Sequence, residues 1–421
     1  MTKPRVVIVG AGFGGLQCAH RLARRRIDVV LIDRHNYHLF TPLLYQVASS
    51  LLNPSEVAIP VRSIFRGSTR VRFRVATVTG IDLDARRLRM EDGAEIPYDT
   101  VVVAAGSRTN FFGLQALERS ALGVKDLSDA LGLRNHVLGC FEQALREEDP
   151  ALRLRRMTFV IVGGGPTGVE YAGALSELFR LVLVSDFPDL EVEQARVVLL
   201  EARDRLLSEF PAELGDYARK RLESLGVDVY LNTAVAGYDG EAVTLAGGEK
   251  IGAASMIWAA GVRPAGLAGR LDVPRGRSGR IEVDEFLRVR GRETAFAIGD
   301  IAAVPGPDGD LLPMMAPPAM QAGRHAADNI LRAARGRPLR PFRYRDKGIM
   351  ATIGRNVGVA RIGGVNLKGF IGWAAWLLVH LYFLIGFRNR LVVLIQWAWN
   401  YFRYDRPIRI ISRPRRPGEE E

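Results

Sequence analysis

Cysteine is scarce in this sequence of 421 residues, which contains only Cys18 and Cys140. A disulfide framework needs several paired cysteines, and a structural zinc site needs cysteine or histidine ligands at short spacings. Neither pattern is present, so we expect no metal site. Both cysteines fall in helical patterns, LQCAHRLARR and HVLGCFEQA, which indicates small buried side chains. This usage is typical of a reducing compartment.

The sequence also lacks an apolar leader, internal repeats and long low-complexity segments. Its N-terminus, MTKPRVVIVG, enters a strand pattern at once, so we expect no signal or transit peptide. The 58 basic and 46 acidic residues give a formal net charge of +12. The basic residues are scattered rather than interleaved with aromatic ones, which argues against a nucleic-acid-binding protein.

The C-terminal part departs from this scatter, because arginines flank its most apolar and aromatic stretches. Such a pattern is typical of attachment to an anionic membrane surface. The arginines concerned are Arg388, Arg390, Arg403, Arg406, Arg409, Arg413, Arg415 and Arg416.

A glycine-rich turn follows the first predicted strand, in VVIVGAGFGG. In a dinucleotide-binding unit the first glycine permits a tight turn, the second lets a pyrophosphate approach, and the third allows close helix–strand packing. Gly10, Gly12 and Gly15 have this spacing. Asp33 ends the next strand pattern, VVLID, where a carboxylate accepts hydrogen bonds from a ribose.

The same pattern recurs in FVIVGGGPTGVE, with Gly163, Gly165 and Gly168, and with Glu201 ending VVLLE. Two such units in one chain indicate two nucleotides and favour hydride transfer from a nicotinamide to a flavin. Glu201 disfavours the 2′-phosphate of NADPH, but Arg203 lies two residues on and leaves NADPH open.

The order of elements predicts an α/β fold with two Rossmann-like dinucleotide-binding domains, the second inserted in the first. Strand patterns near 5–9, 28–32 and 100–104 belong to the first unit, and AFAIGDIAAV returns to it. An amphipathic helical module ends the chain. The predicted segments are 1–112 (first nucleotide domain), 113–156 (helical connection), 157–265 (second nucleotide domain), 266–343 (return to the first) and 344–421 (C-terminal module).

Five segments together resemble the type II NADH dehydrogenases, single-chain NADH:quinone oxidoreductases of respiratory membranes. They are HNYHLFTPLLYQVAS (35–49), GSRTNFFG (106–113), GGGPTGVEYAGAL (163–175), YRDKGIMATIGR (344–355) and GFIGWAAWLLVHLYFLIGF (369–387). The resemblance implies tightly bound FAD, NADH as substrate and reduction of a membrane quinone without proton pumping. It also implies a homodimer attached peripherally to the cytoplasmic face of the cell membrane.

The resemblance assigns the cofactor-binding residues in two sets. The set for FAD is Gly10, Gly12, Gly14, Gly15, Asp33, Arg34, Ala105, Gly106, Gly299 and Asp300. The set for NADH is Gly163, Gly165, Thr167, Gly168, Glu201, Ala260 and Gly261.

The resemblance also assigns residues to the reaction itself. Glu170 matches a glutamate beside the nicotinamide and flavin, although a helix first-turn acid is the alternative. Gln46 is expected near the flavin or the quinone entrance, with core packing as its alternative. The family's AQxxxQ quinone motif is altered here: Gln321 keeps the first glutamine and His325 replaces the second. Lys347 matches a basic residue of that site, and its alternative is a surface salt bridge.

The apolar stretch Phe370–Phe387 has 18 residues and one side chain that titrates near neutral pH, His380. At about 1.5 Å per residue it would reach about 27 Å, just enough to cross a bilayer core. Positive charge on both flanks favours helices lying in the interface. The tryptophans expected near the headgroups are Trp373, Trp376, Trp397 and Trp399. A membrane span and a dimer contact are the other two interpretations.

Related flavoproteins are the nearest competing functions. Disulfide reductases need a cysteine pair soon after the first acidic strand end, and residues 34–50 contain no cysteine. Sulfide:quinone reductases also depend on several cysteines. An FAD-dependent NAD(P)H oxidase or reductase with another acceptor, and a redox-sensing scaffold that binds both nucleotides, stay open as alternatives.

Overall fold

The computed structural model describes residues 3–403, 406 and 408–412. Within them the chain forms two compact units. Unit 1 comprises 1–39, 59–108 and 262–347, and unit 2 comprises 40–58, 109–261 and 348–421.

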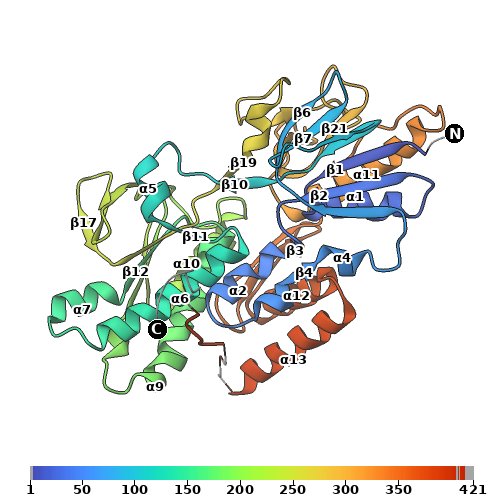
Figure 1. Ribbon diagram of the computed structural model, residues 1–421. Coiled ribbons are helices and arrows are strands. Elements are labelled where there is room, and N and C mark those ends of the chain that lie inside the picture. The colour runs from blue at the N-terminus through green and yellow to red at the C-terminus, as the bar shows by residue number, and fades with distance from the viewer. Residues whose placement is uncertain (1–2, 404–405, 407, 413–421) are drawn as a thin grey trace, which may run out of the picture. The chain divides into compact units, whose positions relative to one another are not determined.

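A five-stranded parallel sheet forms the centre of unit 1, in the order β21-β9-β1-β2-β5 (Figure 1). Strand β1 is apolar and almost wholly buried, as expected when helices cover both faces of a parallel sheet. The sheet strands are β1 (Arg5–Val9), β2 (Asp28–Asp33), β5 (Val71–Val75), β9 (Thr100–Val103) and β21 (Ala295–Ala297).

Two long helices of unit 1, α1 (Phe13–Ala23) and α11 (Ala316–Ala333), pack against each other. Glycines permit their close approach, because a Cβ on Gly323 would lie 2.1 Å from the Gly14 carbonyl oxygen. The smaller elements are β3 (Tyr37–Leu39), β4 (Ala58–Pro60), α4 (Val61–Ile64), β6 (Val78–Asp82), β7 (Arg87–Met90), β8 (Glu95–Pro97), β10 (Ser107–Thr109), β19 (Val262–Pro264), β20 (Ile281–Glu282) and β22 (Ala302–Ala303).

Unit 2 repeats the parallel arrangement in the order β11-β18-β12-β13-β14 (Figure 1). Its strands are β11 (Leu122–Gly123), β12 (Thr158–Val162), β13 (Arg196–Leu200), β14 (Val227–Tyr230) and β18 (Ser255–Trp258). Its helices up to the last sheet are α2 (Leu44–Ala48), α3 (Pro54–Val57), α5 (Gln115–Ser120), α6 (Leu127–Ala144), α7 (Pro150–Arg156), α8 (Pro166–Leu178), α9 (Val184–Asp186) and α10 (Ala212–Ser224).

Two antiparallel sheets and two C-terminal helices complete unit 2. The antiparallel strands are β15 (Val235–Tyr238), β16 (Ala242–Leu245), β17 (Lys250–Gly252), β23 (Ile349–Thr352), β24 (Gly358–Ile362) and β25 (Val365–Lys368). Helices α12 (Gly369–Phe383) and α13 (Phe387–Arg403) follow and contact each other. The expected α/β fold with an inserted second Rossmann-like unit is confirmed.

Residues 40–58 group with unit 2, so the prediction that all of 1–112 belongs to the first nucleotide domain is wrong for this segment. The physical reason is packing. Helix α2 contacts α6 and α8, and α3 contacts α13, so the segment buries its apolar side chains in unit 2. This places Gln46 in unit 2, together with Glu170.

Candidate active site

The first glycine turn lies between β1 and α1 in unit 1. Gly10 has a φ of 107°, and a Cβ there would lie 2.2 Å from the Ala104 carbonyl oxygen. A Cβ on Gly15 would lie 1.8 Å from the Gly10 carbonyl oxygen, whereas one on Gly12 would meet nothing within 4 Å. The first and third glycines therefore shape the turn, and the second faces open space that a pyrophosphate can approach.

Asp33 fastens this turn to the end of β2. Its Oδ2 accepts the backbone N–H of Ala11 at 2.6 Å, and its Oδ1 accepts that of His35 at 2.8 Å. A carboxylate offers about four acceptor positions, so the side chain retains capacity for a ribose hydroxyl. The neighbouring Arg34 donates from Nε to Nε2 of His35 at 2.9 Å.

The ends of β9 and β21, which pair in the sheet, bring a second group of predicted residues together in unit 1. Ser107 donates from Oγ to Oδ2 of Asp300 at 2.5 Å. Gly106 and Gly299 have φ of 70° and 72°, which turn the backbone sharply on both sides of this contact. Ala105 is half-buried beside them. The residues fit the FAD assignment: a glycine cradle, a fixed ribose acceptor and a second carboxylate at neighbouring strand ends.

The second glycine turn, between β12 and α8 in unit 2, has the same construction. Gly163 has a φ of 112°, and a Cβ there would lie 2.6 Å from the Ala259 carbonyl oxygen. A Cβ on Gly168 would lie 1.9 Å from the Gly163 carbonyl oxygen, and one on Gly165 would meet nothing within 4 Å. Again the second glycine is the one that faces open space.

Glu201 takes the place in unit 2 that Asp33 takes in unit 1. It accepts the N–H of Gly164 at 2.6 Å and that of Arg203 at 2.8 Å. The Arg203 guanidinium donates to the Ser208 hydroxyl at 2.5 Å. Thr167 is exposed in the first turn of α8, and half-buried Ala260 and Gly261 follow β18. This arrangement fits a nucleotide whose ribose hydroxyls face Glu201.

Glu170 lies one turn further along α8 and is 7% exposed. It is the fifth residue of a helix that begins at Pro166 and has no acid in its first turn, so the helix-dipole alternative is wrong. Its Oε1 accepts the backbone N–H of Thr352 at 3.2 Å and the indole N–H of Trp376 at 3.1 Å. Burial raises the pKa of Glu170 to about 8, and the two hydrogen bonds offset part of that rise.

A chain of buried hydrogen bonds, which passes through the backbone N–H and the side chain of Thr352, leads from Glu170 to Gln46. Thr352 shares a hydrogen bond between its Oγ1 and the Tyr45 hydroxyl at 2.8 Å. Gln46 donates from Nε2 to the Tyr45 hydroxyl at 3.0 Å and accepts the indole N–H of Trp397 at 2.9 Å. Helices α2, α8, α12 and α13 and strand β23 each supply a member of this Glu170 network. Within this network the buried Glu170 carboxyl group can hold a proton out of contact with bulk water.

The two glutamine-motif residues, Gln321 and His325, and the nearby assigned residue Lys347 all belong to unit 1. Gln321 and His325 are one turn apart on α11. Gln321 donates to the Arg345 carbonyl oxygen at 2.9 Å and accepts the Arg345 N–H at 3.1 Å, while His325 Nε2 bonds the Arg340 carbonyl oxygen at 2.8 Å. Both side chains thus hold 340–345 against α11. Lys347 is exposed at the end of the unit.

Two expectations for the C-terminal module are corrected. Trp376, expected near the headgroups, is only 1% exposed and bonds Glu170. Arg406, expected beside lipid, is buried: it donates to the carbonyl oxygens of Ser49 and Ala174 and pairs with Glu177 at 3.5 Å. Arg409 pairs with Asp186 at 2.6 Å. Arg413, Arg415 and Arg416 lie outside the described residues.

Many of the remaining apolar side chains of α12 and α13 are exposed. No described helix is long and apolar enough to cross a bilayer. Helix α12 ends at Phe383, and a new helix begins at Phe387. We define the hairpin face as the strongly exposed apolar residues of this pair. They are Phe370, Ile371, Leu378, Tyr382, Phe383, Phe387, Leu391, Leu394, Ile395, Trp399 and Phe402.

Three residues of these sites carry no prediction from the sequence: Ser107, Tyr45 and Thr352. Tyr45 precedes Gln46 and Ser107 follows Gly106, so proximity along the chain was the available signal for two of them. Thr352 carries no local signal, because its contact with Glu170 joins residues 182 apart. Cys18 and Cys140 are buried free thiols, as predicted.

The comparisons with known proteins agree with this geometry. The family model described as pyridine nucleotide-disulphide oxidoreductase matches residues 4–323. The chain is 39% identical to the type II NADH:quinone oxidoreductase Ndh of Mycobacterium tuberculosis, over 94% of this chain and 88% of that protein. It is also 39% identical to NdhA of the same organism, over 95% and 87%.

Among solved structures, that of NDH2 from Plasmodium falciparum in complex with NADH matches the fold. Its TM-score is 0.90 at 20% identity, covering 97% of this chain and all of that one. The chain therefore belongs to the pyridine nucleotide-disulphide oxidoreductases and, among them, to the type II NADH:quinone oxidoreductases.

Proposed function

We propose that this protein oxidises NADH and reduces a membrane quinone, using FAD held in unit 1. This proposal rests on the presence, in one chain, of two glycine turns and the buried Glu170 network. In each turn the second glycine faces open space, and a carboxylate accepts a backbone N–H of the turn. When bound, FAD accepts the hydride of NADH and passes two electrons to the quinone. The protein supplies binding, orientation and proton handling.

The two nucleotide turns have different tasks. Gly12, Asp33 and Asp300 hold FAD as a resident cofactor. Gly165 and Glu201 hold NADH, which exchanges at every turnover. A carboxylate at Glu201 repels a 2′-phosphate, and the Arg203 guanidinium is engaged by Ser208, so NADH is the preferred substrate over NADPH.

Glu170 acts as a proton carrier for quinone reduction. Two-electron reduction of a quinone to a quinol consumes two protons. A carboxyl group with a pKa near 8 is largely protonated at pH 7 and is close enough to neutrality to give up its proton and recover it. Gln46 lies on the same network and assists in positioning the quinone. The resemblance also assigns Gln321, His325 and Lys347 to quinone reduction, and the contacts of Gln321 and His325 lie within unit 1.

The hairpin face attaches the protein to the cytoplasmic surface of the membrane. Its apolar residues are unusual for a water-facing surface, and Arg388, Arg390 and Arg403 lie among them, which favours an anionic lipid interface.

A homodimer is part of the proposal, and analytical ultracentrifugation in detergent tests it. If the second copy instead covered the hairpin face, the detergent-free protein would form dimers that do not bind vesicles.

The decisive experiment is anaerobic mixing of purified protein with NADH, followed by a soluble quinone. NADH bleaches the visible flavin absorbance, and quinone restores it with a stoichiometry of one quinone per NADH. A flavin that NADH reduces but quinone fails to reoxidise would support a redox-sensing scaffold instead. Steady-state turnover separates the two, because a sensor keeps its reduced complex.

A further inference from the structure

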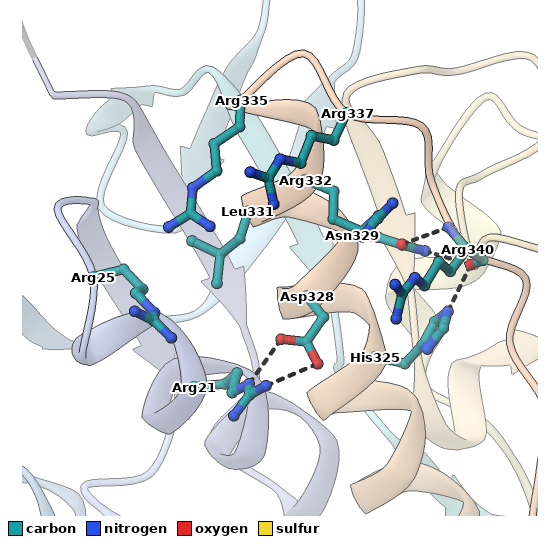
Figure 2. Close-up of a pocket in the computed structure, with 10 residues that line it drawn as sticks. All are labelled: Arg21, Arg25, His325, Asp328, Asn329, Leu331, Arg332, Arg335, Arg337 and Arg340. Carbon is teal, nitrogen blue, oxygen red and sulfur yellow. Dashed lines mark hydrogen bonds and ion pairs between the residues drawn. The ribbon is translucent and has the colours of Figure 1, made fainter.

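A cavity of about 320 Å³ in unit 1 has a lining dominated by arginine. Figure 2 shows its side chains coming from three places: the end of α1, the C-terminal half of α11 and the segment that follows α11. We call it the arginine pocket. It is lined by Arg21, Arg25, His325, Asp328, Asn329, Leu331, Arg332, Arg335, Arg337 and Arg340.

The close packing of α1 on α11 brings the first two groups together. Arg21 in the last turn of α1 donates to both carboxylate oxygens of Asp328, at 2.7 and 3.2 Å. This contact joins the two helices and neutralises the one acid of the lining. Arg25, just after the end of α1, also lines the pocket (Figure 2).

The segment after α11 is held in place by side chains of the helix. Asn329 is fully buried, donates to the Arg340 carbonyl oxygen at 2.9 Å and accepts the Arg340 N–H at 3.0 Å. His325 bonds the same carbonyl oxygen. Arg332 donates to the Pro338 carbonyl oxygen at 2.5 Å. The backbone that carries Arg335, Arg337 and Arg340 is therefore fixed before any ligand arrives.

Four guanidinium groups of the pocket stay available. Within the described part of the chain, no ion pair with a carboxylate joins Arg25, Arg335, Arg337 or Arg340. Cations near helix C-termini complement the helix dipole, which explains Arg21 and Arg332. It does not explain Arg335, Arg337 and Arg340, which lie beyond the helix. Like charges held close together on a fixed backbone repel one another, and an anion would relieve that repulsion.

We propose that the arginine pocket binds a compact polyanion that carries at least two phosphate groups. Guanidinium groups match phosphate oxygens in charge and in hydrogen-bond geometry, and several of them converge here on a volume within the usual range for small ligands. The shared chemistry is a multiply charged phosphate. Its source is either a soluble polyphosphate compound or the headgroup of an anionic lipid. The inference does not depend on any step of NADH oxidation.

The test compares the FAD-loaded protein with two triple variants. R335Q/R337Q/R340Q removes three charges from the pocket, and R66Q/R270Q/R277Q removes three exposed arginines of unit 1 outside it. Isothermal titration calorimetry with inorganic tripolyphosphate is expected to give at least tenfold weaker binding for the pocket variant than for the control variant. Equal flavin content and melting temperature in the two variants show that both are folded.

A second arm uses vesicles of cardiolipin, an anionic lipid with two phosphate groups, and phosphatidylcholine, with pure phosphatidylcholine as the neutral reference. If tripolyphosphate does not distinguish the variants but the pocket variant binds the anionic vesicles at least tenfold more weakly than the control, the phosphate comes from lipid. The proposal is overturned if neither arm separates the variants. It is also overturned if sulfate, at matched ionic strength, binds the unaltered protein as tightly as tripolyphosphate does.

Discussion

At the scale of single residues, Glu170 makes the sharpest prediction about pH. With a pKa near 8, its protonated form is lost as the pH rises through 8, so the rate of quinone reduction should fall above that value. Glu170→Gln cannot carry the proton. We expect its turnover to be at least 10²-fold lower and to lack this fall, measured by steady-state NADH oxidation between pH 6 and 9.5.

The same shift affects stability. The folded pKa of Glu170 lies above the ordinary value of 4.5, so its stabilising effect is complete below pH 4.5 and is lost as the pH rises toward 8. Glu170→Gln should therefore gain stability relative to the wild type over this range, by at most about 1.4 kcal/mol per pH unit. An activity loss without this change in relative stability would place the ionisation elsewhere.

Trp376 is predicted to tune Glu170 rather than to react. Its indole N–H donates to the carboxylate and favours the ionised form, so Trp376→Phe should raise the pKa of Glu170 and move the fall in activity to higher pH. Trp399→Phe is the matched control, because Trp399 is 53% exposed on the adjacent helix. Identical pH profiles for both variants would mean that the hydrogen bond has no influence on the acid.

At the scale of elements, the two glycine turns give opposite results for the same substitution. Alanine at Gly12 or Gly165 meets no protein atom within 4 Å, so both variants should fold. Gly12→Ala should purify without bound flavin, whereas Gly165→Ala should keep its flavin and show at least a tenfold higher KM for NADH. Absorbance spectra and initial rates distinguish them. Loss of flavin from Gly165→Ala alone would reverse the assignment of the two units.

The helix pair α12–α13 makes a separate prediction. Ile371, Leu378 and Phe387 are 65%, 70% and 81% exposed, so glutamate at all three should leave the fold intact. Burying each apolar side chain in the interface is worth about 1.5–3 kcal/mol, so vesicle affinity should drop at least 100-fold in a co-sedimentation assay. The control is glutamate at Leu145, Leu181 and Tyr230, which are 43–45% exposed elsewhere in unit 2.

The sequence allowed some elements to be predicted well and others poorly, for physical reasons. Strands β1, β2, β12 and β13 are continuous apolar runs that end at glycine or acid, and such local patterns can be read directly. The burial of Trp376 could not be predicted from the sequence, because α12 is apolar on every side and has no polar face to show which side meets solvent. Residues 40–58 joined unit 2 through contacts with α6, α8 and α13, which lie far along the chain and which no local pattern encodes.

At the scale of the whole molecule, the net charge of +12 predicts how attachment responds to salt. Screening at 0.5 M salt should weaken binding to anionic vesicles, because the Debye length falls well below its value of about 10 Å at 0.1 M. The apolar contribution of the hairpin face persists, so binding should level off rather than vanish. Binding to phosphatidylcholine vesicles should change little over the same salt range. A complete loss at high salt would mean that charge alone attaches the protein.

The burial of Trp376 and Arg406 has a further consequence for how this protein can be altered. Along the sequence, Trp376 precedes and Arg406 follows most residues of the hairpin face, and both side chains are buried in unit 2. Cutting the chain before α12 would remove the hydrogen bond to Glu170 and leave Glu177 without its buried partner. The segment that carries the hairpin face is thus an integral part of unit 2 and not a detachable tail. A water-soluble form should be made by replacing the exposed apolar residues of the hairpin face with polar ones, because truncation would also remove part of the core.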